Sequence, residues 1–202
     1  MVNASAVSII LLAGGEARRL PGKLMLRLDG EPLLLRTFRR LTADGRRPCV
    51  VSIRDPLAPE LQAQLPTAMI ADRFENCGPL GGLASAAAAV TTPLFFAAAG
   101  DLPQLSAGFV DRLEARYQEL SVATGAPAAI IPRRQDGRIE PLAALYETEA
   151  FVAGASAAIA RGEKKVTAAL RGLPVVYYEL TSADASELLN INTTEDWQRL
   201  HA

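Results

Sequence analysis

Short apolar runs alternate with segments of helical periodicity along the first 121 residues. The run AVSIILLA (6–13) does not alternate with polar residues, which is typical of a strand buried on both faces of a sheet. The segment EPLLLRTFRRLTADG (31–45) places Leu34, Phe38 and Leu41 on one face opposite basic residues, and Gly45 ends it, so it predicts a helix. Further strands are predicted over 47–53, 67–72 and 93–101, and further helices over 78–90 and 106–121.

The pattern loosens after residue 121 but still contains both kinds of element. Strands are predicted over 127–134 and 138–147 around an RQDGR turn, a helix over 156–172, a strand over 174–180 and a short helix over 194–200. Strands that alternate with helices imply right-handed βαβ units and a parallel sheet. No repeat, low-complexity tract or linker divides the chain. We therefore predict an α/β fold, with one single-domain, doubly wound, mostly parallel sheet over residues 1–202.

Composition narrows the class of protein. Half of the residues are apolar and about a fifth are charged, as in soluble globular proteins. A net charge of −1 gives no electrostatic reason to expect nucleic acid or an anionic membrane as partner. No apolar run approaches the ~18 residues of a membrane span. Cys49 and Cys77 have no CxxC partner, so a disulfide framework is not indicated and we expect a cytoplasmic protein.

Histidine is nearly absent from the sequence. The only one is His201, beside the C-terminus. This argues against Ser-His-Asp and Cys-His catalytic groups and against zinc sites built on imidazoles. Any chemistry therefore depends on carboxylates, lysines, arginines and the backbone.

Polar residues follow several of the predicted strands. They are residues 14–23, Arg54, Asp55, Asp72 and Asp101. Ligands of open α/β sheets bind at the carboxyl ends of the strands. The sequence therefore predicts a binding site at that edge of the sheet.

The stretch IILLAGGEARRLPGKL (9–24) has the composition of a phosphate loop but matches neither common form. The GxGxxG fingerprint is absent. A Walker A loop needs four residues before its GK pair and a hydroxyl residue after it, whereas six residues separate Gly15 from Gly22 and Leu24 follows the lysine. A magnesium ion would therefore need ligands from elsewhere in the chain.

The loop can still bind phosphate. Gly14 and Gly15 let backbone amides approach a phosphate closely, and Arg19 and Lys23 would neutralise its charge. The alternative is a strand-to-helix turn that carries solvated basic residues.

The LAGG sequence, an arginine four residues beyond its second glycine and a lysine shortly after resemble the signature loop of nucleotidyltransferases, in particular the molybdenum cofactor guanylyltransferase (MobA-like) family. Four later segments match family segments in the family's order: ADRFENCGPLGGL (71–83), AAAGDLPQL (97–105), RIEPLAALY (138–146) and NINTTEDW (190–197). The resemblance therefore covers almost the whole chain and implies a Rossmann-like nucleotidyltransferase fold.

The resemblance implies roles for individual residues at the nucleotide end. Lys23, Arg19 and Asp101 would be catalytic, and Asp101 would hold Mg²⁺. The nucleotide-binding set would be Leu12, Ala13, Gly14, Gly15, Lys23, Arg54, Asp72 and Asp101.

The sequence around Asp101 and Asp72 also allows each of these carboxylates to be interpreted without the resemblance. Asp101 ends the run FFAAAGD at the sheet edge, where a carboxylate is poorly solvated unless it holds a cation, and magnesium takes one or two carboxylates plus phosphate oxygens. The alternative for Asp101 is a turn or helix N-cap beside Pro103. Asp72 alternatively belongs to an ordinary polar loop.

The acceptor side would involve Gly78, Gly82, Asn190 and Asn192. The glycines of GPLGGL leave room for a flat or bulky substrate, or they simply give the loop flexibility. Asn190 and Asn192 match family asparagines near the acceptor or the metal, and they equally suit turn and N-cap positions.

The implied reaction transfers GMP from GTP to the phosphate of molybdopterin and releases pyrophosphate with magnesium. A phosphate monoester is largely ionised near neutral pH, so no general base is needed, which suits a chain without a usable histidine. Proteins that deliver the cofactor or accept it are possible partners.

The sequence departs from the family pattern at two places. The family loop commonly runs R-M-G-x-D-K, whereas the segment from Arg19 to Lys23 is one residue shorter, lacks the aspartate and contains a proline. Arg54 stands where a family asparagine helps to read guanine, and it can contact either guanine O6 and N7 or a phosphate. LAGG rather than LAAG favours the guanine branch over the related cytidylyltransferases.

Two alternatives follow from these departures. One is a CTP-using nucleotidyltransferase with molybdopterin or a sugar or polyol phosphate as acceptor. The other is a relative that binds nucleotide or cofactor without turnover, which the shortened loop favours. Intact Lys23, Asp72 and Asp101 argue against the second alternative, because a binding protein has no evident need for the metal carboxylate.

Overall fold

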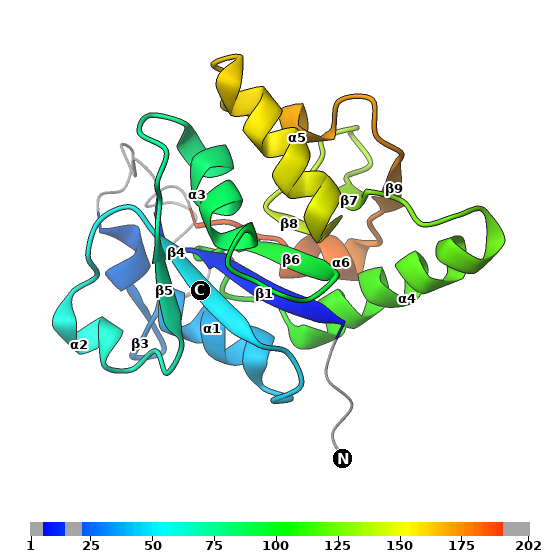
Figure 1. Cartoon of the computed structure of the whole chain (residues 1–202). Helices are drawn as coiled ribbons and strands as arrows, with labels where there is room; N and C mark the ends of the chain where they lie inside the picture. Colours follow the sequence, from blue (N-terminus) through cyan, green and yellow to red (C-terminus); the bar gives the residue numbers. More distant parts are fainter. Residues whose placement is uncertain (1–5, 15–21, 192–202) are drawn as a thin grey trace.

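The computed structural model describes residues 6–14 and 22–191, and Figure 1 shows the arrangement of its elements. The strands are β1 (Val7–Leu12), β2 (Arg27–Leu28), β3 (Glu31–Pro32), β4 (Cys49–Ile53), β5 (Ala68–Ala71), β6 (Leu94–Ala99), β7 (Ala129–Arg133), β8 (Ala143–Glu147) and β9 (Val175–Glu179). The α-helices are α1 (Leu33–Thr42), α2 (Pro59–Gln62), α3 (Gly78–Ala87), α4 (Ala107–Ala123), α5 (Thr148–Ala160) and α6 (Ser182–Glu187), and the 3-10 helices are η1 (Lys23–Met25) and η2 (Val166–Leu170).

Seven strands form one sheet in the order β5-β4-β1-β6-β8-β7-β9. Strand β1 pairs in parallel with β4 and β6, β4 with β5, and β7 with β9. Strand β8 is antiparallel to both of its neighbours, β6 and β7, so it alone among these seven runs in the opposite direction. The prediction of an α/β fold with a mostly parallel sheet is confirmed.

Helices cover both faces of this sheet, which explains why its central strands are apolar throughout. Ile9 and Leu11 of β1 belong to the core that contains the buried side chains of α1 and α4. Ile10 and Leu12, which point to the other face, pack in the core formed with α3 and α5. Figure 1 shows α3 and α5 on one side of the sheet and α1 on the other. The sheet is therefore doubly wound, as predicted.

All four helices predicted within the described residues have different bounds in the structure: α3 and α4 differ by a few residues at their ends, and the other two differ for an identifiable reason. Helix α1 begins at Leu33, because Glu31 and Pro32 instead form β3 and pair with β2. The helix predicted over 156–172 is wrong: α5 ends at Ala160, Gly162 adopts a left-handed conformation with φ 75°, and η2 follows separately. The short helix predicted over 194–200 lies outside the described residues.

Helix α5 and η2 pack at very short range through Gly154. A Cβ atom built on Gly154 would lie 1.9 Å from the carbonyl oxygen of Ala169 in η2. Only a residue without a side chain fits this position. Gly154 therefore sets how closely the segment after α5 returns to the helix.

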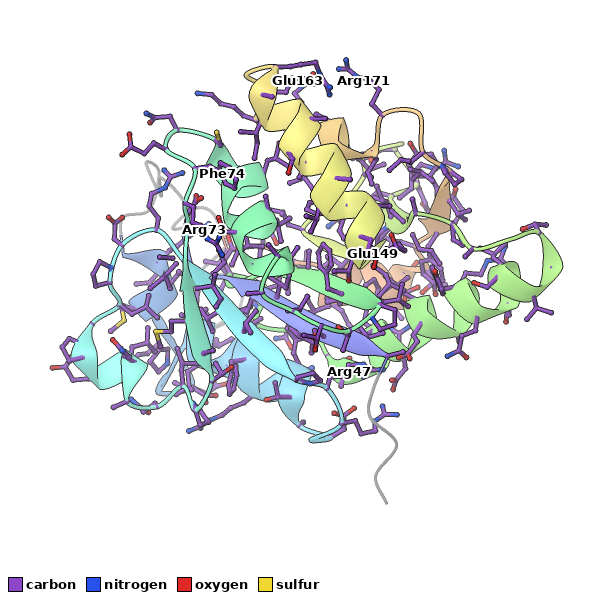
Figure 2. All side chains as sticks on the ribbon, viewed as in Figure 1. Arg47, Arg73, Phe74, Glu149, Glu163 and Arg171 are labelled. Atoms are coloured by element: carbon purple, nitrogen blue, oxygen red, sulfur yellow. The ribbon has the colours of Figure 1, made fainter. Side chains whose placement is uncertain are left out.

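Two charged clusters hold the N-terminal half of α4. The Arg47 side chain, which is 2% exposed, forms ion pairs with Asp111 at 2.5 Å and Glu114 at 2.6 Å (Figure 2). In the same part of α4, the guanidinium of Arg112, next to Asp111 in the sequence, lies 2.9 Å from Asp184 and 2.5 Å from Glu187 of α6. These contacts join α4 to the start of β4 and to α6.

Asp184 also completes the N-terminal capping box of α6 with Thr181. Burial raises the pKa of Asp184, but hydrogen bonds from Thr181 and the charge of Arg112 outweigh it, and the pKa lies below its usual value. Asp184 is therefore an ionised anchor of α6. Across residues 6–14 and 22–191, none of the helices has the length and apolar character that crossing a membrane requires.

Candidate active site

A cavity of about 770 Å³ opens at the carboxyl ends of β1, β4, β5 and β6. Its volume lies within the range of small-molecule sites. Leu142, just before β8, also lines it, because β8 runs in the opposite direction and its N-terminal end lies beside the end of β6. The cavity is therefore at the sheet edge where the sequence predicts a binding site.

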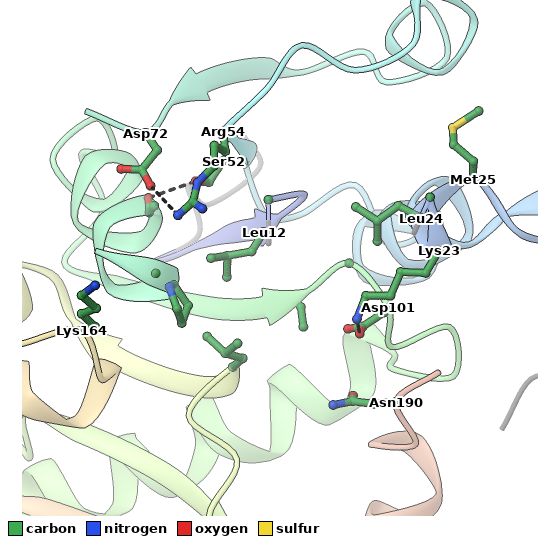
Figure 3. Close-up of a pocket in the computed structure, with 18 of the residues that line it drawn as sticks. Leu12, Lys23, Leu24, Met25, Ser52, Arg54, Asp72, Asp101, Lys164 and Asn190 are labelled. Atoms are coloured by element: carbon green, nitrogen blue, oxygen red, sulfur yellow. Dashed lines mark hydrogen bonds and ion pairs between the residues drawn. The ribbon is translucent and has the colours of Figure 1, made fainter. Parts of the chain in front are cut away.

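One end of the cavity contains an ion pair between Lys23 and Asp101. Lys23 begins η1, directly after Gly22, which has φ 70°. Its ammonium contacts Oδ2 of Asp101, and the two side chains are 21% and 8% exposed (Figure 3). A mostly buried carboxylate is thus held by a lysine that reaches it from a separate loop.

Gly100 places Asp101 at this point. The Gly100 amide donates to the Leu12 carbonyl at 3.0 Å, which extends the β1–β6 ladder by one residue. A Cβ atom on Gly100 would lie 2.7 Å from Cδ1 of Leu34 and 2.9 Å from that same carbonyl. Glycine is therefore required directly before the aspartate.

The other end of the cavity contains Arg54 and Asp72. Nη2 of Arg54 lies 4.0 Å from Oδ2 of Asp72, and the amide of Phe74 donates to Oδ1 of Asp72 at 2.9 Å. A Cβ atom on Gly14 would lie 3.2 Å from the backbone nitrogen of Arg54. The turn after β1 therefore packs directly against the residue that follows β4.

The glycines of α3 serve packing as well as the cavity. A Cβ atom would lie 2.9 Å from Oδ1 of Asp72 at Gly81 and 2.8 Å from Oγ of Ser52 at Gly82. The Ser52 hydroxyl donates to the Gly82 carbonyl at 3.0 Å. Protein atoms fill the space beside these two glycines, which therefore let α3 approach the sheet closely. Their role is close packing of a helix and not the flexibility of a loop.

A third part of the cavity is lined by Lys164 and Gly78, whereas Asn190, which also lines the cavity, lies close to Asp101 (Figure 3). Lys164 lies in the loop between α5 and η2, beside Gly78, which has φ 58°. Within the described part of the chain, Lys164 forms no ion pair, unlike Lys23 and Arg54. Figure 3 shows it far across the cavity from Asp101.

Ion pairs at the far end of α5 fix the loop that carries Lys164. Glu163 pairs with Arg161 at 2.6 Å and with Arg171 at 2.8 Å (Figure 2). The hydrogen bond from Arg161 and the charge of Arg171 hold the pKa of Glu163 below its usual value. Lys164 is not among the predicted site residues, because the helix predicted over 156–172 runs through this loop, although Gly162 is a signal for a helix end.

Most of the predicted site residues line this one cavity. These are Leu12, Gly14, Lys23, Arg54, Asp72, Gly78, Gly82, Asp101 and Asn190. Ala13 belongs instead to the core on the α1 side, and its amide already donates to the Ser52 carbonyl at 2.8 Å. Gly15, Arg19 and Asn192 lie outside the described residues.

The described residues contain no group of three or more histidine, cysteine, aspartate or glutamate side chains that could hold a metal ion. Asp101 is instead a single buried carboxylate at the cavity wall. Magnesium commonly takes one or two carboxylates and completes its shell with phosphate oxygens and water. The donor set therefore fits a cation shared with a polyphosphate better than one enclosed by protein.

The sequence matches the model of the MobA-like NTP transferase domain over residues 9–175. The chain belongs to this family. The resemblance seen in its five segments is confirmed, and so is the prediction that the protein is a nucleotidyltransferase.

Two relatives of this MobA-like chain are similar over nearly their whole length. The molybdenum cofactor guanylyltransferase of Xanthomonas euvesicatoria is 32% identical, over 95% of this chain and 92% of the relative. The probable molybdenum cofactor guanylyltransferase of Thermococcus kodakarensis is 30% identical, over 94% of this chain and 92% of the relative.

Two solved structures are similar to the chain in fold but differ in their sequence identity to it. Molybdopterin-guanine dinucleotide biosynthesis protein A from Archaeoglobus fulgidus superposes with a TM-score of 0.77 at 26% identity and covers 96% of both chains. The 2-C-methyl-D-erythritol 4-phosphate cytidylyltransferase from Thermus thermophilus superposes with a TM-score of 0.69 at 16% identity, over 96% of both chains. The second likeness shows the fold alone, so it does not favour the CTP-using alternative.

Proposed function

We propose that this MobA-like chain is a guanylyltransferase that transfers GMP from GTP to the phosphate of a molybdopterin-type acceptor and releases pyrophosphate. The observation that carries this proposal is one cavity with Lys23 and Asp101 at one end, Arg54 and Asp72 at another, and Lys164 at a third. The names of the relatives supply the acceptor class and the base.

We assign Arg54 and Asp72 to the nucleoside. A guanidinium offers paired donors for O6 and N7 of guanine, and a carboxylate accepts from amino, ring N–H or ribose hydroxyl groups. Leu12, between the two charged ends in Figure 3, provides an apolar surface for the nucleotide. The tight contact of Gly14 with the Arg54 backbone keeps the phosphate loop and the nucleoside end in register.

We assign Lys23 and Asp101 to the phosphates, with Arg19 as a further cation from the sequence. An oxygen of the acceptor phosphate attacks the α-phosphorus of GTP, the bond from that phosphorus to the bridging oxygen breaks, and the electron pair leaves with pyrophosphate. A phosphate monoester has a second pKa of about 6, so the nucleophile is already ionised and needs no general base. Lys23 then neutralises charge on the leaving pyrophosphate.

Enzymes that transfer phosphoryl or nucleotidyl groups generally use a divalent cation, which neutralises charge on the phosphates. We propose Mg²⁺, held by Asp101 together with phosphate oxygens. For that site to form, Lys23 must release Oδ2 of Asp101 and turn to the phosphates, an exchange that the shared cavity allows.

The acceptor would occupy the remaining part of the cavity. It would extend from Gly78 and Gly82 of α3 to Asn190 beside Asp101, and Asn192 is added from the sequence. Lys164, which forms no ion pair with the described residues, supplies an ammonium for an anionic group of the acceptor. We further propose that residues 1–202 act as one nucleotidyltransferase unit in the cytoplasm, served by a protein that delivers or receives the cofactor.

The test is a titration of the wild type with GTP, CTP, ATP and UTP in the presence of magnesium, followed by pyrophosphate release with molybdopterin. We expect selective binding of GTP. Lys23→Ala should weaken GTP binding by about 10- to 100-fold, as loss of a charge-assisted hydrogen bond implies. Asp101→Ala should abolish turnover while GTP still binds. Asp55→Ala, an exposed neighbour of Arg54 that does not line the cavity, is the matched control.

Other outcomes would redirect or end the proposal. Preference for CTP would place the protein among cytidylyltransferases and leave the assignment of the phosphate end intact. GTP binding without transfer to the acceptor would indicate a binding protein. No nucleotide binding at all would mean that this cavity is not a nucleotide site.

A further inference from the structure

We propose that Arg134 is a positioning residue for the acceptor side of the cavity, and that it acts through the backbone segment 188–191, which carries Asn190. The inference rests on the proposed function. It concerns a side chain that follows β7 and is absent from the cavity wall. Its role would be to hold a cavity residue in place rather than to touch the substrate.

Arg134 reaches the segment through a hydrogen bond to its backbone. Nη2 of Arg134 donates to the Leu188 carbonyl at 2.8 Å, and Nε pairs with Oε1 of Glu140. The two charged side chains are 20% and 24% exposed. The backbone of Glu140 is fixed in turn, since its amide donates to the Pro132 carbonyl at 2.9 Å. The guanidinium is thus oriented by Glu140, whose own backbone is hydrogen-bonded to strand β7.

The segment itself is attached at both ends. Leu188 and Ile191 are buried, and Asn190 between them is exposed toward the cavity. The Ile191 amide donates to the carbonyl of Asp101 at 3.3 Å. Figure 3 shows Asn190 close to Asp101. Asn190 therefore lies between two backbone hydrogen bonds. One joins Arg134 to Leu188, and the other joins Ile191 to Asp101, the residue proposed to bind the metal.

The helix before this segment does not need Arg134 for its own anchorage. Helix α6 is joined to α4 through the pairs of Arg112 with Asp184 and Glu187, and its N-terminus is capped. Loss of Arg134 should therefore leave α6 in place and free only the chain beyond it. That separates a positioning role from a general contribution to stability.

The first experiment compares Arg134→Ala and Glu140→Gln with the wild type in steady-state transfer to molybdopterin. We expect a rise of about 10-fold in the KM for the acceptor, since small misplacements of binding groups are costly. The Kd for GTP should stay within about twofold. Arg134→Lys should raise the KM less than Arg134→Ala does. A lysine can still donate to either the Leu188 carbonyl or the Glu140 carboxylate, but it cannot bridge the two as a guanidinium fork does.

The matched control is Arg138→Ala. Arg138 lies in the same turn, is 75% exposed and pairs with Asp136 rather than with the segment. It should leave both constants unchanged. The thermal midpoint of each variant is measured alongside, so that a loss of folding is separated from a change in the acceptor constant.

The decisive experiment is a double-mutant cycle with Asn190→Ala. If Arg134 acts through Asn190, Arg134→Ala should have little further effect once Asn190 is already alanine. Amide exchange of the peptide that contains 188–191 should also rise in Arg134→Ala and not in Arg138→Ala. Additive effects, or equal losses in GTP and acceptor binding, would overturn the proposal. An inactive wild type would instead refute the proposed function, so the two failures are distinguishable.

Discussion

The contact between α5 and η2 allows a sharp test of the packing that places the Lys164 loop. The perturbation is Gly154→Ala. The added methyl group would lie 1.9 Å from the Ala169 carbonyl oxygen and 2.9 Å from the Ala169 carbonyl carbon. Real Cβ contacts essentially never fall below 3.0 Å, so η2 must move away from α5 by more than about 1 Å.

The expected cost follows from two opposing contributions. Forced movement of a packed element costs about 1 to 3 kcal/mol, and the upper end applies because the obstacle is backbone rather than a flexible side chain. Alanine improves helix propensity over glycine by about 1 kcal/mol and offsets part of this. We therefore expect a net destabilisation of about 2 kcal/mol, which corresponds to a fall of roughly 4 to 8 °C in Tm for a chain of this size.

The assay is thermal and chemical unfolding, with Gly108→Ala in α4 as the matched helix control. A Cβ atom on Gly108 would meet its nearest atoms at 3.6 and 3.7 Å, which is ordinary contact. Gly108→Ala should therefore be neutral or stabilising by up to about 1 kcal/mol. Equal stability changes for the two variants, or a stabilised Gly154→Ala protein, would refute the close approach of η2 to α5.

Three further predictions test other parts of the molecule. The pKa of Asp184 lies below its usual value of 3.8, so Asp184→Asn should lower the free energy of unfolding by about 1.5 to 3 kcal/mol at neutral pH. Urea titrations should show this difference from wild type shrinking as the pH falls below 3.8, and a constant difference would contradict the prediction. Burial raises the pKa of Cys49 to about 12, so iodoacetamide at pH 8 should label Cys77 in the folded protein and both thiols only after unfolding, as mass spectrometry can count; rapid labelling of Cys49 would be the contrary result. Lys164→Ala should raise the acceptor KM about 10-fold without changing the affinity for GTP. Lys165 does not line the cavity, so Lys165→Ala should change neither constant in the same kinetic assay. Equal effects of the two substitutions would exclude a specific role for Lys164.

The sequence pattern was sufficient to predict those site residues that come directly after a strand. Asp72 and Asp101 come directly after apolar runs, and the parallel sheet brings such residues to one edge whatever the details of packing. The same logic predicted Arg54 and the glycine turn at Gly14. These positions depend on periodicity and chain direction, which local sequence encodes well.

Local sequence could not predict the contacts that depend on the return of distant segments. Lys164 reaches the cavity because Gly162 ends α5 and η2 then packs back at Gly154, a close contact that leaves no periodic signal. The reversal of β8 is likewise set by its neighbours on both sides. The bond from Arg134 to the Leu188 carbonyl joins residues that no pattern relates.

The pairing of opposite charges within the cavity has a consequence for how ligands compete. Lys23 is already held by Asp101, and Arg54 stands 4.0 Å from Asp72, so neither cation waits with its charge uncompensated. A simple anion would have to displace an internal carboxylate and offers little in return. A triphosphate that brings its own cation can satisfy both halves of the broken pair at once. The site should therefore tolerate salt and orthophosphate better than its number of basic residues implies, and its affinity should depend on nucleotide and metal arriving together.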